Sequence, residues 1–399
     1  MLVRRGRIGV WLFAGIFVSA HLGAQMAAKK GGGDAANAVK PKLETRTLDL
    51  SQGEPIIGMP PPIATAAPLL CSSDGDIFPL VYTPVASGQV SVIPDVYGIS
   101  PQRAVKHLTI PLPKNFKYTR VENFFPGKYS AVYLVEGIQP QGAAADADST
   151  KYQYFLTRTD RDGDSPEVVK LELPFEVGKV AVFDTGDVLV LGANTTDLYP
   201  VLALLHSDGR LNRILNFDDR AYRDATLSAG TSVARPDESN TTALRRVVLG
   251  SLFMAQLIPW GSEILLVQPG SNLPVYRISS AGAVTQVKVA LPGGLLLATI
   301  EGSGERDTWL AIARSVDSFR GLNSGKVVEN LQEHMFEIDP YTGDILRALE
   351  VEGPRALHVV CGADHRATAI YFGERRAKDK SDQPMNDGPG PLMYASAPR

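Results

Sequence analysis

The chain has 399 residues, of which 44% are hydrophobic and 21% are charged, and its formal net charge is −3. This mildly acidic balance gives no electrostatic footprint for a phosphate backbone, so we exclude nucleic acid as a partner. The length exceeds the usual size of one domain, although repetitive all-β architectures reach it as a single unit.

The N-terminal segment has the three parts of a secretory signal: basic residues at Arg4, Arg5 and Arg7, an apolar run over 8–20, and small residues at Ala20 and Ala24. The apolar run is shorter than the roughly 20 residues needed to cross a bilayer, which favours a cleaved signal over an uncleaved anchor. Removing residues 1–24 removes three arginines and no acidic residue, so the net charge falls from −3 to −6. We therefore expect a periplasmic or secreted protein with no membrane attachment after cleavage.

Residues 25–42 are rich in Gly, Ala and Lys without an apolar period, which is typical of a flexible linker. We expect residues 43–399 to fold as one domain. Its apolar segments are short, often alternate with polar residues, and are separated by Gly-containing turns, whereas no segment keeps a helical period for three turns. The sequence therefore predicts an all-β domain.

The turns of this domain are of two alternating kinds. The first joins two strongly apolar runs and recurs at 69–83, 123–135, 180–192, 255–268, 297–313 and 358–372. The second joins a more polar pair and occurs at 154–173, 202–217, 275–291 and 334–351. Two buried strands followed by two half-exposed ones form the four-stranded antiparallel blade of a β-propeller. The count predicts six blades; the alternative is a seven-bladed ring in which 218–248 form a degenerate blade.

Glycines mark the first kind of turn in five blades, at Gly75, Gly127, Gly186, Gly261 and Gly304, and the sixth blade lacks one. Residues 391–397 supply the C-terminal strand of that sixth blade. We expect the early strand 43–50 to complete the same blade from the other end of the chain, because a ring of sheets must cover its exposed edges.

In this pattern the domain resembles the six-bladed propellers of secreted and periplasmic proteins, a group that includes the TolB-like, NHL-like and gluconolactonase-like folds. The resemblance covers nearly the whole predicted domain but lies in the repeat pattern alone. The sequence has neither a Trp-Asp repeat dipeptide nor a recurring Gly-Asn-Val-Tyr-Val-Ala-Asp strand. The resemblance implies a fold and assigns no catalytic residue.

Strand order decides which connections share a face of the ring. Connections from first to second and from third to fourth strand are short, and we call their side the short-turn face. The opposite side, the long-loop face, carries the insertions 136–150, 217–246, 314–333 and 373–390. Long loops on a rigid scaffold concentrate binding residues, so this face is the candidate for function. Solvated insertions without a role are the alternative for 136–150 and 373–390, whereas 217–246 keeps Phe217, Tyr222 and Leu227 and is expected to pack.

Polar residues beside the inner-strand positions are the candidates for a site in the central channel. Glu122, Gln256 and Glu301 could hold a divalent cation there, with Ser72 and Thr299 close by, although packing is the commoner role of such residues. No nucleophile elbow, phosphate loop or dinucleotide motif occurs in a plausible context, so we assign no catalytic residue.

Two other patterns point to metals more weakly. His358 and His365 flank Cys361, but no third or fourth zinc ligand follows nearby. Alternating aspartates form a calcium-like pattern without the glycine and glutamate that a calcium loop needs, at Asp160, Asp162 and Asp164. We interpret the first as ordinary strand or surface histidines and the second as an Asp-Gly turn.

The two cysteines, Cys71 and Cys361, fall at matching inner-strand positions of blades one and six, which become neighbours when the ring closes. An oxidising compartment favours a disulfide between them. Equivalent inner strands can lie near or beyond the roughly 7 Å limit for the two Cα atoms, so two buried free thiols are the alternative.

Two functions fit these features. The first is a monomeric binding or scaffold module that takes a protein, peptide or glycan through its long-loop face. The alternative is a metal-dependent lactonase or hydrolase at the channel, with Glu122 and Glu301 as ligands. The insertions on the long-loop face and the lack of a coherent set of catalytic residues favour the binding or scaffold module.

Overall fold

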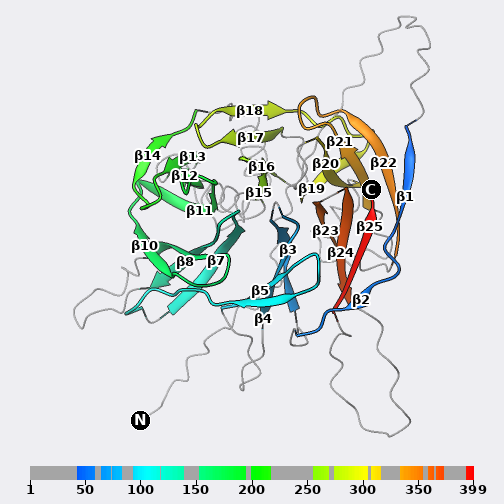
Figure 1. Ribbon diagram of the computed structural model, residues 1–399. Coiled ribbons are helices and arrows are strands. Elements are labelled where there is room, and N and C mark those ends of the chain that lie inside the picture. The colour runs from blue at the N-terminus through cyan, green and yellow to red at the C-terminus, as the bar shows by residue number, and fades with distance from the viewer. Residues whose placement is uncertain are drawn as a thin grey trace, which may run out of the picture.

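The computed structural model describes residues 43–58, 64–72, 74–82, 93–116, 118–138, 152–194, 199–216, 255–268, 274–303, 307–315, 333–353, 358–363, 365–372 and 392–399. The predicted signal 1–24 and linker 25–42 lie outside these ranges. Every regular element within them is a strand, and the strands form six four-stranded antiparallel blades arranged around a central axis (Figure 1). The prediction of an all-β, six-bladed propeller is confirmed. The described part of the chain contains no helix that could span a membrane.

Within each blade the strands run from the inside of the ring to the outside. Blade one holds β3 (Ala64–Cys71), β4 (Ile77–Tyr82), β5 (Asp95–Ile99) and β6 (Val105–Leu108). Blade two holds β7 (Tyr118–Pro126), β8 (Ser130–Ile138), β9 (Tyr152–Asp160) and β10 (Glu167–Leu171). Blade three holds β11 (Phe175–Val182), β12 (Val188–Asn194), β13 (Pro200–Leu205) and β14 (Leu211–Ile214).

The second half of the ring repeats this order. Blade four holds β15 (Gln256–Trp260), β16 (Glu263–Val267), β17 (Val275–Ser279) and β18 (Val284–Val287). Blade five holds β19 (Leu295–Ser303), β20 (Trp309–Ser315), β21 (Glu333–Ile338) and β22 (Ile345–Glu352). Blade six holds β23 (His358–Ala363), β24 (Arg366–Phe372), β25 (Leu392–Pro398) and the short β2 (Glu54–Pro55).

The first strand of the domain, β1 (Thr45–Asp49), does not complete blade six, so that expectation was wrong. It pairs in parallel with β22, with Thr45 opposite Ala348, and adds an outer strand to blade five (Figure 1). The outer strand of blade six is β2, which pairs antiparallel with β25. Because β2 follows β1 closely in the chain, one N-terminal segment covers the edges of two adjacent blades.

Blades three and four are direct neighbours. Leu257 and Ile264 of blade four belong to the same core cluster as Val180 and Leu204 of blade three. The described strands form six blades and none of them lies between these two, so the seven-bladed alternative was wrong. Residues 218–248, which it required, lie outside the described ranges.

Burial on both faces explains why the second strand of a blade has such an apolar sequence. Both faces of β12 are covered by neighbouring blades, and Val188–Leu191 are fully buried. The outer strand β14 of the same blade is exposed along its whole length. Continuous apolar runs therefore mark inner strands and mixed runs mark outer strands, because burial on two faces removes the polar alternation.

Neighbouring blades interlock at the third-to-fourth turns of the short-turn face. In blades two to five, each of these turns has a glycine with φ between +77° and +82° packed against the outer edge of the preceding blade: Gly163, Gly209, Gly282 and Gly343. A cation of the preceding blade also contacts each turn: Lys106 with Asp162, Arg158 with the Ser207 carbonyl, Arg213 with the Ala281 carbonyl, and Arg277 with the Pro340 carbonyl. The repeat is therefore a repeat of contacts between blades as well as of turns.

Candidate functional site

Glu122, the first channel candidate, is the extra residue of a β-bulge in β7. The register with β8 steps from Val121 opposite Val135 to Asn123 opposite Leu134, which leaves Glu122 without a partner residue in the ladder. Its carboxylate forms an ion pair with Arg120, and its side chain is only 8% exposed.

Arg120 begins a line of polar residues that crosses blade two, which we call the interblade row: Arg120, Glu136 and Tyr154. Register places Arg120 opposite Glu136 and Glu136 opposite Tyr154, so the three share one face of the blade. The Arg120 Nη2 atom lies 3.3 Å from Glu136 Oε2. Leu171 continues this line on β10 and packs in one core cluster with Phe175 of blade three. The row therefore faces blade three.

Burial dominates the electrostatics of the row. It raises the pKa of Glu122 and of Glu136, although the Arg120 guanidinium opposes both shifts. It also raises the pKa of Tyr154 to about 12, and the charges of Glu136, Glu122 and Glu176 add to this shift while Arg120 opposes it. Carboxylates thus outweigh the cation at the Tyr154 hydroxyl.

Blade three contributes Lys179, a partly buried lysine on the inner strand β11. Desolvation lowers its pKa to about 8, and the Glu122 charge only partly offsets that effect. No ion pair with a carboxylate of the described residues forms at its amino group, and the Glu122 charge acts on it without such a pair.

A pocket of about 510 Å³ opens at the outer end of the interblade row, between blades two and three. Its walls come from the start of β9, the end of β10 and the start of β11, including Tyr154, Leu171, Phe175, Glu176 and Val177. These strand ends lie at the long-loop face, because residues 172–174 connect β10 of blade two to β11 of blade three on that side. The volume falls in the range of small-ligand pockets, and the walls combine apolar surface with a few polar groups.

The other two channel candidates lie on different blades. The Gln256 Oε1 atom of blade four accepts a hydrogen bond of 2.5 Å from the Thr299 hydroxyl of blade five. Asn123 likewise links blades two and three, because its Oδ1 atom accepts a 2.8 Å bond from the Val180 N–H. Glu301 is buried, with 9% of its surface exposed. Polar inner-strand residues thus tie neighbouring blades together.

The described residues contain no group of three or more His, Cys, Asp or Glu side chains that could hold a metal ion. A divalent cation on Glu122, Gln256 and Glu301 stays a prediction.

Near Cys361, the exposed His365 takes the turn position that a glycine occupies in other blades, with φ +55°. In the aspartate pattern, Asp160 Oδ1 accepts hydrogen bonds from the backbone N–H groups of Asp162 and Asp164, as in an Asp-Gly turn.

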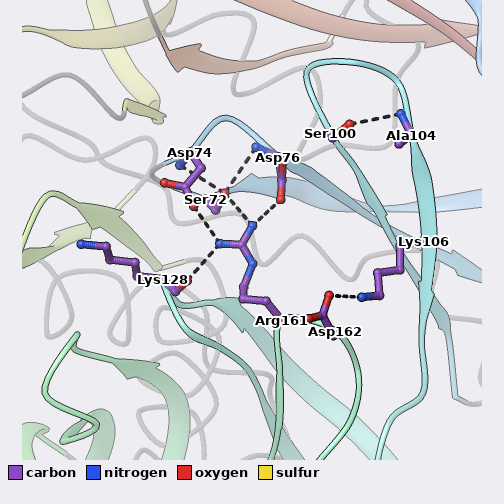
Figure 2. A network of polar contacts seen from close by, with 9 residues as sticks. All are labelled: Ser72, Asp74, Asp76, Ser100, Ala104, Lys106, Lys128, Arg161 and Asp162. Atoms are coloured by element: carbon purple, nitrogen blue, oxygen red, sulfur yellow. Dashed lines mark hydrogen bonds and ion pairs between the residues drawn. The ribbon is translucent and has the colours of Figure 1, made fainter.

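That Asp-Gly turn carries a residue that the sequence pattern did not single out. Arg161 reaches from blade two into the first turn of blade one, where it contacts Ser72, Asp74 and Asp76 (Figure 2). It also donates to the Lys128 carbonyl at 3.1 Å. Burial raises the pKa of Asp76 against the opposing effect of Arg161. Nothing in the local sequence separates Arg161 from a solvent-exposed turn residue, because all of its acidic partners lie far away in the chain.

Ser72, expected near the channel, belongs to this network. It is 2% exposed, and its hydroxyl accepts hydrogen bonds from the Asp74 and Asp76 N–H groups. The network lies on the short-turn face and joins two blades, so we assign it a structural role.

The two cysteines form a disulfide in the structure, with Cα atoms 5.8 Å apart. The bond joins the inner strands β3 and β23 of blades one and six. Both cysteines are buried, among Ile77, Ile99 and Ile370. Cys361 is therefore not a thiolate that could bind a metal with His358 and His365.

Most of the long-loop insertions lie outside the described residues: 139–150, 217–246 with Phe217, Tyr222 and Leu227, 316–332, and 373–390. The expectation that 217–246 packs into a site stays a prediction. The pocket between blades two and three lies on the long-loop face and is lined by described residues.

No protein-family model matches the chain, and no curated protein matches it. A DUF4623 family protein from Bacteroides eggerthii aligns with 85% of this chain and 71% of its own, at 8% identity and a TM-score of 0.40. A puromycin hydrolase aligns with 84% of this chain and 54% of its own, at 12% identity and a TM-score of 0.40. Dipeptidyl peptidase 4 from Porphyromonas gingivalis aligns with 75% of this chain, at 8% identity and a TM-score of 0.33, and the chain spans 42% of that enzyme. Likenesses this low carry no conclusion about activity, and they assign the chain to none of the TolB-like, NHL-like or gluconolactonase-like groups.

Proposed function

We propose that the protein is an exported binding module, whose protein, peptide or glycan ligand docks on the long-loop face at the pocket between blades two and three. The observation that carries the proposal is the pocket of about 510 Å³ placed at the end of the interblade row. Its apolar walls offer area for burial and its polar groups fix orientation, as ligand sites require.

Export has independent support from the sequence and from the disulfide. Residues 1–24 have the composition of a secretory signal. The bond between Cys71 and Cys361 is of the kind that persists in oxidising compartments. A binding role on a rigid ring suits this setting, because the blades hold strand-end residues in fixed positions.

The test is a binding screen of residues 25–399 against a glycan array and a random heptapeptide library. Lys170→Trp places an indole at the rim of the pocket and removes one positive charge. Arg210→Trp makes the same change on the short-turn face, at a side chain that is 79% exposed. We expect binding to fall at least tenfold in Lys170→Trp and to stay unchanged in Arg210→Trp. Equal binding by wild type and Lys170→Trp contradicts the proposal.

A further inference from the structure

The outer strand of blade three offers a backbone edge for a further strand. β14 is the last strand of its sheet and lies on the outer rim of the ring, with no described strand on its outer side (Figure 1). All four of its residues are exposed. Leu215, just after β14, donates its N–H to the Leu202 carbonyl of β13, so the N–H and C=O groups of Ile214 point away from β13. An extended chain can form hydrogen bonds with such an edge.

Two apolar side chains lie beside this edge. Leu211 is 38% exposed and Ile214 is 58% exposed. Register places both on the face of blade three that carries Val182, and Val182 packs against Gly127 of blade two. Leu211 and Ile214 therefore face the boundary between blades two and three at the outside of the ring.

The outer edges of the other blades do not combine these features. The N-terminal strands β1 and β2 cover the edges of blades five and six. Within the described residues, β6 and β18 expose no large apolar side chain, and β10 exposes Val168 alone. Among the described outer strands, β14 is thus the one that joins an uncovered edge to two exposed apolar side chains on one face.

The protein itself shows what kind of segment fits such an edge. β1 adds to β22 by backbone pairing, and the Leu50 N–H that follows it donates to the Glu352 carbonyl at 2.7 Å. Leu48 and Leu50, two residues apart, are buried in a core cluster that contains Tyr371 of blade six. An extended segment with apolar residues at alternate positions therefore fills the outer boundary between two blades, as in recognition by strand addition.

The edge of β14 leads to the pocket of the proposed function. Ile214 shares its face of blade three with Val177, which lines the pocket and lies one row of residues nearer the long-loop face. A strand bound beside Ile214 and continuing towards the long-loop face brings its next residues to the pocket. In that direction it runs away from Arg210, which precedes Leu211 in the turn on the short-turn face.

We propose that an extended peptide segment of the ligand pairs with β14 as a fifth strand of blade three and packs an apolar side chain against Leu211 and Ile214. The inference rests on the proposed function and narrows its ligand to a peptide or protein. A glycan lacks the regular row of N–H and C=O groups that such pairing requires.

The experiment uses residues 25–399 and peptides captured from a phage-displayed random heptapeptide library. We expect Ile214→Lys to weaken their binding at least tenfold in fluorescence anisotropy, because a charge at the edge opposes strand addition. We expect the same of Ile214→Pro, which removes the outward N–H and keeps an apolar side chain. Gln286→Lys and Gln286→Pro make the same changes at an exposed residue of the outer strand β18 and should leave binding unchanged.

Hydrogen exchange at the Ile214 amide reports on the edge directly. We expect fast exchange in the free protein and exchange at least tenfold slower with a captured peptide bound. Slow exchange in the free monomer would show that another segment of this chain covers the edge. Slow exchange that accompanies a dimer in gel filtration would show that a second copy covers it. Either result overturns the inference.

The outcomes separate this inference from the proposed function. The inference is wrong if no peptide is captured, or if captured peptides bind both Ile214 variants as well as wild type. The proposed function then stands if those peptides or a glycan lose binding in Lys170→Trp. If peptides lose binding in the Ile214 variants and keep it in Lys170→Trp, the strand addition stands and the pocket is not the site.

Discussion

At the scale of single residues, burial between blades two and three disfavours the charged forms of the ionisable side chains there. Lys179 is partly buried with a pKa lowered to about 8 from an ordinary value of 10.5. Glu122 and Glu136 have pKa values raised by burial despite Arg120. A fold that keeps such groups in place gives up stability at this position, as binding sites commonly do.

Lys179→Met should measure that loss. The folded state releases the lysine proton near pH 8 and the unfolded state near pH 10.5. Below pH 8 both states hold it, and the folded state carries the full cost of a desolvated charge. As the pH rises from 8 to 10.5 this cost disappears. The free energy of unfolding therefore increases as the pH rises through this range and decreases as the pH falls through it.

We expect Lys179→Met to be more stable than wild type by roughly 2 kcal/mol at pH 7, with the gap closing towards pH 10.5. Urea unfolding at several pH values measures the gap. Lys170→Met, at an exposed lysine, removes the same charge and should give a small difference that does not change with pH. A constant gap for Lys179→Met would show that the desolvation argument is wrong.

At the scale of elements, the ring depends on turns that fit against the preceding blade. Gly343 has a φ of +79°, and a Cβ at this position would overlap the Lys288 carbonyl oxygen. Its own carbonyl accepts a 3.0 Å hydrogen bond from the Ala290 N–H. The glycine is therefore needed for two separate reasons, the backbone conformation and the close approach of blade four.

A matched pair of substitutions separates these reasons. Gly294 has a φ of +85°, but a Cβ added to it would meet no atom within 4 Å, so Gly294→Ala tests the conformation alone. We expect Gly294→Ala to lower the free energy of unfolding by about 1 kcal/mol and Gly343→Ala by about 3 kcal/mol, because the second also forces two backbones apart. Chemical unfolding gives both values. Equal losses would mean that the contact between blades is not tight.

The elements divide into those that local sequence predicts and those that it does not. The blades were predictable because strand period and turn glycines such as Gly75 and Gly186 are local signals. The position of β1 was not, because a strand far from its partner β22 can cover any free edge of similar polarity. The sequence predicted Glu122 near the channel. Its bulge and its contact with Arg120 could not be predicted, because they depend on the register of β7 and β8. Tyr154 and Lys179 could not be predicted as site residues, because only the strand register and the packing of blades two and three bring them near Glu122.

At the scale of the whole molecule, the ring closes between blades one and six by several independent contacts. The disulfide joins their inner strands, and at the outside Arg103 of blade one pairs with Glu54 of β2. Blade six is also tied to blade five, where β19 pairs in parallel with β23 at Gly302 and Cys361. A ring whose last blade contains strands from both ends of the domain needs such contacts, because its seam is the place where blades can separate.

The disulfide should be the strongest of these contacts. It closes a loop with a sequence separation of 290 residues, for which chain entropy alone gives an upper value of roughly 5 kcal/mol. We expect the double variant Cys71→Ser with Cys361→Ser to lose about 3 to 5 kcal/mol of unfolding free energy. Wild type unfolded with reductant should lose as much, whereas reductant should not change the double variant. Alkylation in denaturant supplies the direct check: no label on the mature protein without reductant and two labels after reduction. Two labels before reduction would show that the seam is closed by packing and the outer ion pair alone.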